Sequence, residues 1–130
     1  EHPDTVATAI RIGNPASWQG ANDAVSQSGG CIDIVTDEEI MAAQSWLAMN
    51  EGIFVEPASA ASVAGLLKCL SCSRCASCPF STSLRPGAKV VLTVTGHGLK
   101  DSDTPVKFGN FTPSESDATL SAVRAVLDKN

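Results

Sequence analysis

The fold is decided by residues 89–95, KVVLTVT, which run directly into Gly96-His97-Gly98. This stretch is the strongest strand candidate in the chain, because it is rich in β-branched residues and apolar enough to be buried on both faces. A strand buried in this way belongs to a parallel sheet, and ligands of open α/β sheets bind at the carboxyl edge. We therefore expect Thr95 and the turn after it to lie at a ligand-binding edge.

The turn leaves a plainer interpretation open. Gly96 and Gly98 can simply make the turn, with His97 seated in it and Thr95 satisfying a backbone group. Spacing alone favours this interpretation, because a Gly-x-Gly pattern is a weak signal by itself. The rest of the chain must decide between a ligand-binding edge and a plain turn.

Helices and strands alternate outward from this stretch. Two more strands are predicted, at residues 31–35 and 53–55. Thr36 and Glu39 match a capping box, so a helix should begin at Asp37. Other helices are expected at residues 4–12, at 17–27, after Pro57, and after a cap at Ser114. The alternation predicts a three-layer α/β fold with a mainly parallel sheet. Three strands make a thin sheet, which resembles one side of a larger one.

Size and charge limit the classes of function. With 130 residues and 13.4 kDa the chain can bury one core. Nine basic against fourteen acidic residues give a net charge of -5, which argues against a nucleic-acid partner. No apolar window suits a membrane span, and residues 1–4 show no leader, so we expect neither membrane attachment nor secretion. The absence of an initial Met allows a piece of a longer chain.

Four of the five cysteines lie within ten residues, as Cys69, Cys72, Cys75 and Cys78, while Cys31 stands apart. The odd count argues against a disulfide framework. The run is similar to iron–sulfur ligation, but the usual run has three residues before its last cysteine. Zinc sites usually draw their cysteine pairs from separated segments. Free thiols in a divergent loop are the favoured interpretation, ahead of a metal or cluster site and of disulfides.

Several ordered motifs resemble one enzyme family. Residues 52–68, GIFVEPASAASVAGLLK, and residues 95–101, TGHGLKD, resemble the carboxyl-terminal part of threonine synthase, a pyridoxal-phosphate enzyme of the tryptophan-synthase-β-like fold. Residues 7–15 and 28–40 agree with that family in the same order. The resemblance implies that residues 1–103 are the carboxyl-terminal part of the catalytic fold. Residues 104–130 would then form a polar tail with a terminal helix.

The resemblance also implies a reaction and a site. Threonine synthases are cytoplasmic lyases of threonine biosynthesis that convert O-phospho-L-homoserine and water to L-threonine and phosphate. At the ring nitrogen of pyridoxal phosphate, this fold type places a neutral hydroxyl, which Thr95 matches. The residues expected to bind the cofactor are Thr95, Gly13, Asn14, Glu56, Ala58 and Ser59. Glu56 can equally be a carboxylate at a helix start, and His97 more readily shapes the turn than transfers protons.

Two parts of the family's site are missing from this sequence. The Schiff-base lysine and the phosphate-binding loop belong to the family's amino-terminal half, and none of the five lysines here lies in a matching motif. The chain alone is therefore expected to be inactive, with no catalytic residue of its own. Its expected partners are the missing amino-terminal half and, in the complete enzyme, a second copy. An uncovered apolar face would make the isolated chain self-associate.

Two other functions remain open at this stage. One is a non-catalytic α/β module, derived from a pyridoxal-phosphate enzyme, that binds a ligand or a metal. The other is a related enzyme such as threonine dehydratase. Residues 11–15, RIGNP, and residues 96–101, GHGLKD, favour the synthase over the dehydratase.

Overall fold

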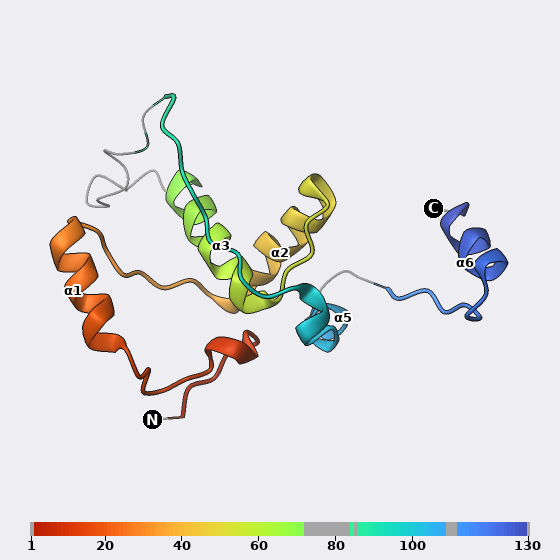
Figure 1. Cartoon of the computed structure of the whole chain (residues 1–130), viewed down its shortest axis with the longest axis horizontal. Helices are drawn as coiled ribbons and strands as arrows, with labels where there is room; N and C mark the ends of the chain where they lie inside the picture. The colour runs from red at the N-terminus through yellow and green to blue at the C-terminus, as the bar shows by residue number, and fades with distance from the viewer. Residues whose placement is uncertain (1, 72–83, 85, 109–111, 130) are drawn as a thin grey trace.

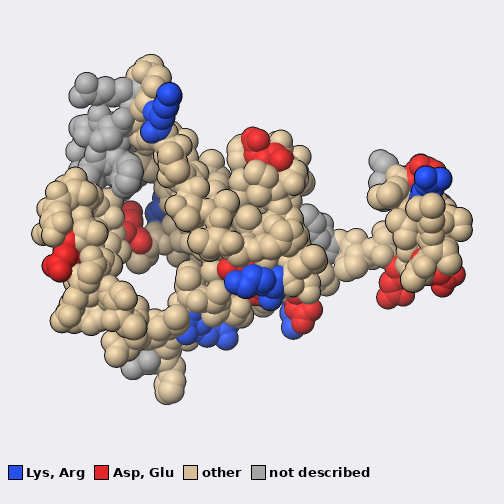
Figure 2. Space-filling view, viewed as in Figure 1, with Lys and Arg blue, Asp and Glu red and all other residues tan. Residues whose placement is uncertain are grey.

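The computed structural model describes residues 2–71, 84, 86–108 and 112–129 (Figure 1). Their elements, in chain order, are η1 (Thr8–Ile10), α1 (Trp18–Ser28), α2 (Asp37–Glu51), α3 (Pro57–Ser71), η3 (Gly98–Asp101), α5 (Asp103–Phe108) and α6 (Leu120–Leu127). Among these residues, no helix combines the length and the apolar character that crossing a bilayer demands. On the face shown in Figure 2, the basic side chains lie in separate places.

The core lies between α2 and α3. The predicted capping box is confirmed: the Thr36 hydroxyl accepts from the Glu39 amide, and the Glu39 carboxylate accepts from the Thr36 amide. Gly52 ends α2 with a φ of 65°, a left-handed value that favours glycine. The buried apolar residues of the two helices are Ile40, Met41, Ala43, Leu47, Ala60, Val63 and Ala64. The alanines among them let the helices pack closely.

The predicted strands are not formed in the described residues. Residues 31–35 and 89–95 carry no ladder, and the isolated bridge between Val55 and His97 is antiparallel. The mainly parallel sheet is therefore not confirmed, and the bridge has the opposite sense. A strand needs a neighbour that takes up its backbone N–H and C=O groups. Val91 is 91% exposed, which is far from the burial on both faces that the sequence predicts.

Three helix predictions need correction. Of the helix expected at residues 4–12, only the three-residue turn η1 forms. Helix α1 begins where expected, but Ser17 makes no side-chain capping bond and no residue of α1 is buried. The last helix starts later than Ser114, because the Thr119 hydroxyl accepts from the Ala122 amide and caps α6. Figure 1 shows α6 standing away from the helix pair.

Glu39 makes the contact between α2 and α3 sensitive to acid. The Thr36 amide donates to its carboxylate and Lys68 lies 3.2 Å away, so the pKa of Glu39 lies below its ordinary value of 4.5. A carboxyl with a lowered folded-state pKa adds stability above its unfolded pKa, and this stability is lost as the pH falls through the folded value.

We expect Glu39→Gln to lower the unfolding temperature slightly at neutral pH and to weaken its fall below pH 4.5. Glutamine can still accept from the cap amide, so the change isolates the charge. Thermal unfolding followed by circular dichroism at several pH values measures the effect. Glu38→Gln, on the exposed side of the same turn, is the matched control. If the unfolding temperatures of the two variants changed equally with pH, the acid sensitivity would not come from Glu39.

Candidate functional site

The predicted binding residues meet where α3 begins. We call residues 54–59 and 95–98 the α3 corner. The amide of Glu56 donates to the carbonyl of Gly96 at 3.0 Å, and the amide of Gly98 donates to the carbonyl of Phe54 at 3.1 Å. These two bonds flank the bridge between Val55 and His97 and hold the two segments side by side.

Ser59 joins helix α3 to the residues before the turn. Its buried hydroxyl oxygen accepts from the amide of Thr95 at 3.1 Å and from the amide of Gly96 at 2.6 Å. The same oxygen lies 3.1 Å from the Thr95 hydroxyl. One turn later, the Ser62 hydroxyl donates to the carbonyl of Thr93 at 3.1 Å. Helix α3 thus replaces a neighbouring strand as the hydrogen-bond partner of this segment.

Glu56 is a buried carboxylate in the corner, with 6% of its surface exposed. It forms an ion pair with Lys100, whose amine lies 3.5 Å from Oε2. A Cβ atom at Gly96 would lie 1.9 Å from the other carboxylate oxygen of Glu56. Position 96 therefore needs glycine because the Glu56 side chain crosses it.

Gly98 has a similar reason to be glycine. A Cβ atom there would lie 2.3 Å from two ring carbons of Phe54. Neither Gly96 nor Gly98 has a positive φ, so close approach of side chains explains both glycines better than turn formation. His97 accepts from the amide of Leu99 through Nδ1 and packs edge-on against Phe54, with ring centroids 6.1 Å apart. This contact agrees with the expected turn-shaping role of His97.

The structure gathers four of the six predicted binding residues. Glu56, Ala58, Ser59 and Thr95 belong to the corner, where Ala58 is half-buried against the core. Gly13 and Asn14 lie exposed between η1 and α1, and within the described residues neither shows a hydrogen bond to the corner. Sequence reasoning missed Ser62, which lies next to the corner and binds the carbonyl of Thr93. Its position three residues after Ser59, on the same face of α3, was the available signal.

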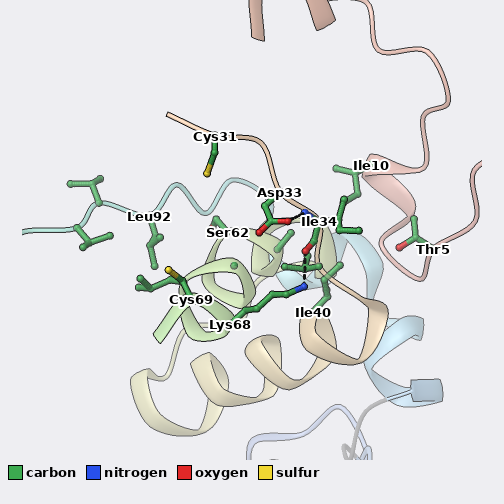
Figure 3. Close-up of a pocket in the computed structure, with 16 residues that line it drawn as sticks. Thr5, Ile10, Cys31, Asp33, Ile34, Ile40, Ser62, Lys68, Cys69 and Leu92 are labelled. Carbon is green, nitrogen blue, oxygen red and sulfur yellow. Dashed lines mark hydrogen bonds between the residues drawn. The ribbon is translucent and has the colours of Figure 1, made fainter. Parts of the chain in front are cut away.

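A cavity lies apart from the predicted site. It encloses about 580 Å³ between α3 and the segments 31–35 and 90–92, and none of Glu56, Ser59 and Thr95 lines it (Figure 3). Lys68 reaches across it, donating to the carbonyl of Ile34 at 2.9 Å and to Glu39. The lining is mostly apolar, as expected for a gap between elements that lack a covering layer. The cavity was not predicted from the sequence.

The cysteine run falls largely outside the described residues, where Cys72, Cys75 and Cys78 lie. Cys69 is half-buried at the cavity wall. Among the residues that the structure describes, no group of three or more His, Cys, Asp or Glu side chains could hold a metal ion. Free thiols therefore stay the favoured interpretation of the run, ahead of a metal or cluster site and of disulfides.

Comparison with known proteins identifies the class. A family described as "Pyridoxal-phosphate dependent enzyme" matches residues 1–96, and the chain belongs to this family. Among its relatives is a threonine synthase of Mycobacterium leprae, 50% identical over 125 residues, which cover 96% of this chain and 31% of the relative. A threonine synthase of Mycobacterium tuberculosis is 50% identical over 128 residues, covering 98% and 32%. That of Methanocaldococcus jannaschii is 42% identical over 127 residues, covering 98% and 29%.

These relatives confirm the resemblance predicted from the sequence. The chain spans about a third of the length of the curated relatives it matches. The family's cofactor is pyridoxal phosphate. The corner fits one part of that cofactor, because Thr95 is exposed and its hydroxyl is held from the protein side by Ser59. An exposed hydroxyl held in this way can form a hydrogen bond with the ring nitrogen of a cofactor that lies on its solvent side.

Proposed function

We propose that this chain is the carboxyl-terminal portion of a threonine synthase, which converts O-phospho-L-homoserine and water to L-threonine and phosphate. The observation that carries the proposal is 50% identity to threonine synthases across nearly the whole chain. The same relatives leave the alternative of a non-catalytic or metal-binding module unfavoured.

The corner would hold the ring of pyridoxal phosphate. When bound, the cofactor supplies the electron sink for the reaction. Thr95 would hydrogen-bond the ring nitrogen, with Ala58 and Ser59 forming the wall of α3 beside it. Glu56 pairs with Lys100 at 3.5 Å, while the Glu56 amide and the Ser59 hydroxyl bind the backbone of Gly96. In this proposal Gly13 and Asn14 approach the cofactor when the loop between η1 and α1 is covered by the rest of the enzyme.

The remaining parts of the site would come from elsewhere in the enzyme. Within the described chain, Lys68 pairs with Glu39 and Lys100 pairs with Glu56, and neither lies in a motif that matches the family's Schiff-base lysine. The Schiff-base lysine and the phosphate loop belong to the amino-terminal half in this proposal, and the isolated chain is inactive. That half also completes the mainly parallel sheet, of which residues 1–103 are one side and 104–130 the tail.

The proposal extends to the setting of the enzyme. A lyase of threonine biosynthesis acts in the cytoplasm, and the free thiol of Cys31 suits a reducing compartment. The complete enzyme is proposed to be a homodimer. Each of these statements goes with the threonine synthase assignment and is tested with it.

A segment exchange tests the function. The matching 125 residues of the Mycobacterium leprae threonine synthase are replaced by the corresponding part of this chain, giving what we call the exchange enzyme. We expect the exchange enzyme to bind pyridoxal phosphate, seen by absorbance, and to release phosphate and threonine from O-phospho-L-homoserine. The 130-residue chain alone should do neither.

The unmodified Mycobacterium leprae enzyme is the positive control. Threonine formation by the isolated chain would overturn the proposed inactivity. An exchange enzyme that binds the cofactor as tightly as the control but releases no phosphate would overturn the threonine synthase assignment. Absorbance and phosphate release together separate a failure of folding from a failure of function.

A further inference from the structure

The hydrogen bonds around Ser59 fix the direction of a proton. A serine hydroxyl has one proton to donate and two lone pairs to accept. Both lone pairs of Ser59 are taken, by the amides of Thr95 at 3.1 Å and of Gly96 at 2.6 Å. The third neighbour is the Thr95 hydroxyl, 3.1 Å away. Amides can only donate, so Ser59 must donate its own proton to Thr95.

The same count determines what Thr95 offers to a ligand. Its oxygen accepts from Ser59, and its own proton has no partner among the described residues. Hydrogen bonds in a chain polarise one another, so two amide donors make Ser59 a stronger donor, which in turn makes Thr95 a stronger donor. Thr95 is exposed, so the proton at the end of this chain faces outward.

The structure assigns to Ser59 the role of a positioning residue that makes Thr95 a hydrogen-bond donor to the ring nitrogen of pyridoxal phosphate. This inference rests on the proposed function, which places the ring against Thr95. A nitrogen that accepts from a hydroxyl carries no proton of its own. Thr95 therefore keeps the ring nitrogen unprotonated, and Ser59 keeps Thr95 in that orientation.

The charged groups near the corner do not compete for this role. Glu56, the buried carboxylate of the corner, is paired with Lys100. His97 is exposed, and its Nδ1 accepts from the amide of Leu99. In the part of the chain that the structure describes, neither side chain forms a hydrogen bond with the hydroxyl of Ser59 or Thr95. The direction of the proton is thus set by backbone amides, which do not titrate.

The test uses nitrogen NMR of the exchange enzyme loaded with pyridoxal phosphate that is ¹⁵N-labelled in its ring. The ¹⁵N chemical shift separates a protonated ring nitrogen from an unprotonated one that accepts a hydrogen bond. With Ser59 in place we expect the unprotonated signal throughout the neutral pH range. In Ser59→Ala the Thr95 hydroxyl is free to turn, and the signal should move toward the protonated value as the pH falls.

Two further variants separate positioning from general damage. Ser59→Thr keeps the hydroxyl and should restore the signal, whereas Thr95→Val removes the donor and should shift it as Ser59→Ala does. Threonine formation should fall about 10- to 100-fold in Ser59→Ala, by analogy with the loss of groups that orient the ligands of a metal site.

A protonated ring nitrogen in the unsubstituted exchange enzyme would overturn the inference, and this measurement requires no variant to fold. An unchanged signal in Ser59→Ala would also overturn it, while threonine formation by the exchange enzyme would still support the proposed function. Loss of threonine formation in the unsubstituted exchange enzyme, with the unprotonated signal retained, would count against the function and not against the proton direction.

Discussion

Gly96→Ala is expected to break the α3 corner. The new Cβ atom would lie 1.9 Å from Oε1, 2.1 Å from Cδ and 2.8 Å from Cγ of Glu56. Two of these atoms lie inside the Glu56 side chain, so rotating the carboxylate alone does not relieve the clash. The side chain must leave its buried site and give up its contact with Lys100. Overpacking of the buried site costs about 2 kcal/mol, and the loss of the ion pair adds little because the Lys100 side chain is 64% exposed.

Urea unfolding of the 130-residue chain, followed by circular dichroism, measures this cost. Gly65→Ala is the matched control, because a Cβ atom there meets nothing within 4 Å and α3 continues through it. Alanine is the better helix former by about 1 kcal/mol, so the control should be neutral or stabilising. Adding Glu56→Ala to Gly96→Ala should recover part of the loss. An equal midpoint for Gly96→Ala and the unsubstituted chain would show that Glu56 does not occupy this site.

Gln44→Ala is expected to separate α2 from the corner. Gln44 is fully buried, and its side-chain amide donates to the carbonyl of Val55 at 2.7 Å. The substitution leaves that carbonyl without its donor and opens a cavity beside the core. A lost buried hydrogen bond and a truncated core side chain together cost about 3 kcal/mol.

A second substitution at position 44 separates the cost of the cavity from the cost of the lost hydrogen bond. Gln44→Leu keeps the volume, and it also removes Oε1, a buried oxygen with no hydrogen-bond partner among the described residues. We expect it to be milder than Gln44→Ala by about 1 to 2 kcal/mol. Gln19→Ala on the exposed helix α1 is the control and should change nothing measurable. Urea midpoints of the three variants give the comparison, and equal losses for the two substitutions at position 44 would rule out a cavity contribution.

Local signals in the sequence predicted the helices near the core well. The capping box at Thr36 and Glu39 and the proline at the start of α3 each act within one helical turn, so neighbouring residues suffice to recognise them. The exposed end of the chain was harder. Both Ser114 and Thr119 are good caps, and nothing buried near α6 decides between them.

The strands show the limit of such signals. Residues 89–95 have strong strand preference, but a ladder depends on a neighbouring segment that supplies its hydrogen bonds. In the described chain Ser59 and Ser62 of α3 supply some of them instead. The sequence offered turn formation as the plain interpretation of Gly96 and did not predict that the Glu56 side chain crosses it, because Glu56 is distant in the sequence. Contacts between distant residues are what sequence patterns least determine.

Residues 89–95 have no neighbouring strand in the described chain, and this has a consequence for handling the protein. Extended apolar segments without neighbouring strands act as templates for any chain that can pair with them. Val91 and Ile34 are 91% and 79% exposed and belong to the two segments that border the cavity. The surface on which the rest of a sheet could form is therefore also the surface through which identical copies can join into aggregates. Expression together with a covering segment should keep more of the chain in the soluble fraction than expression alone.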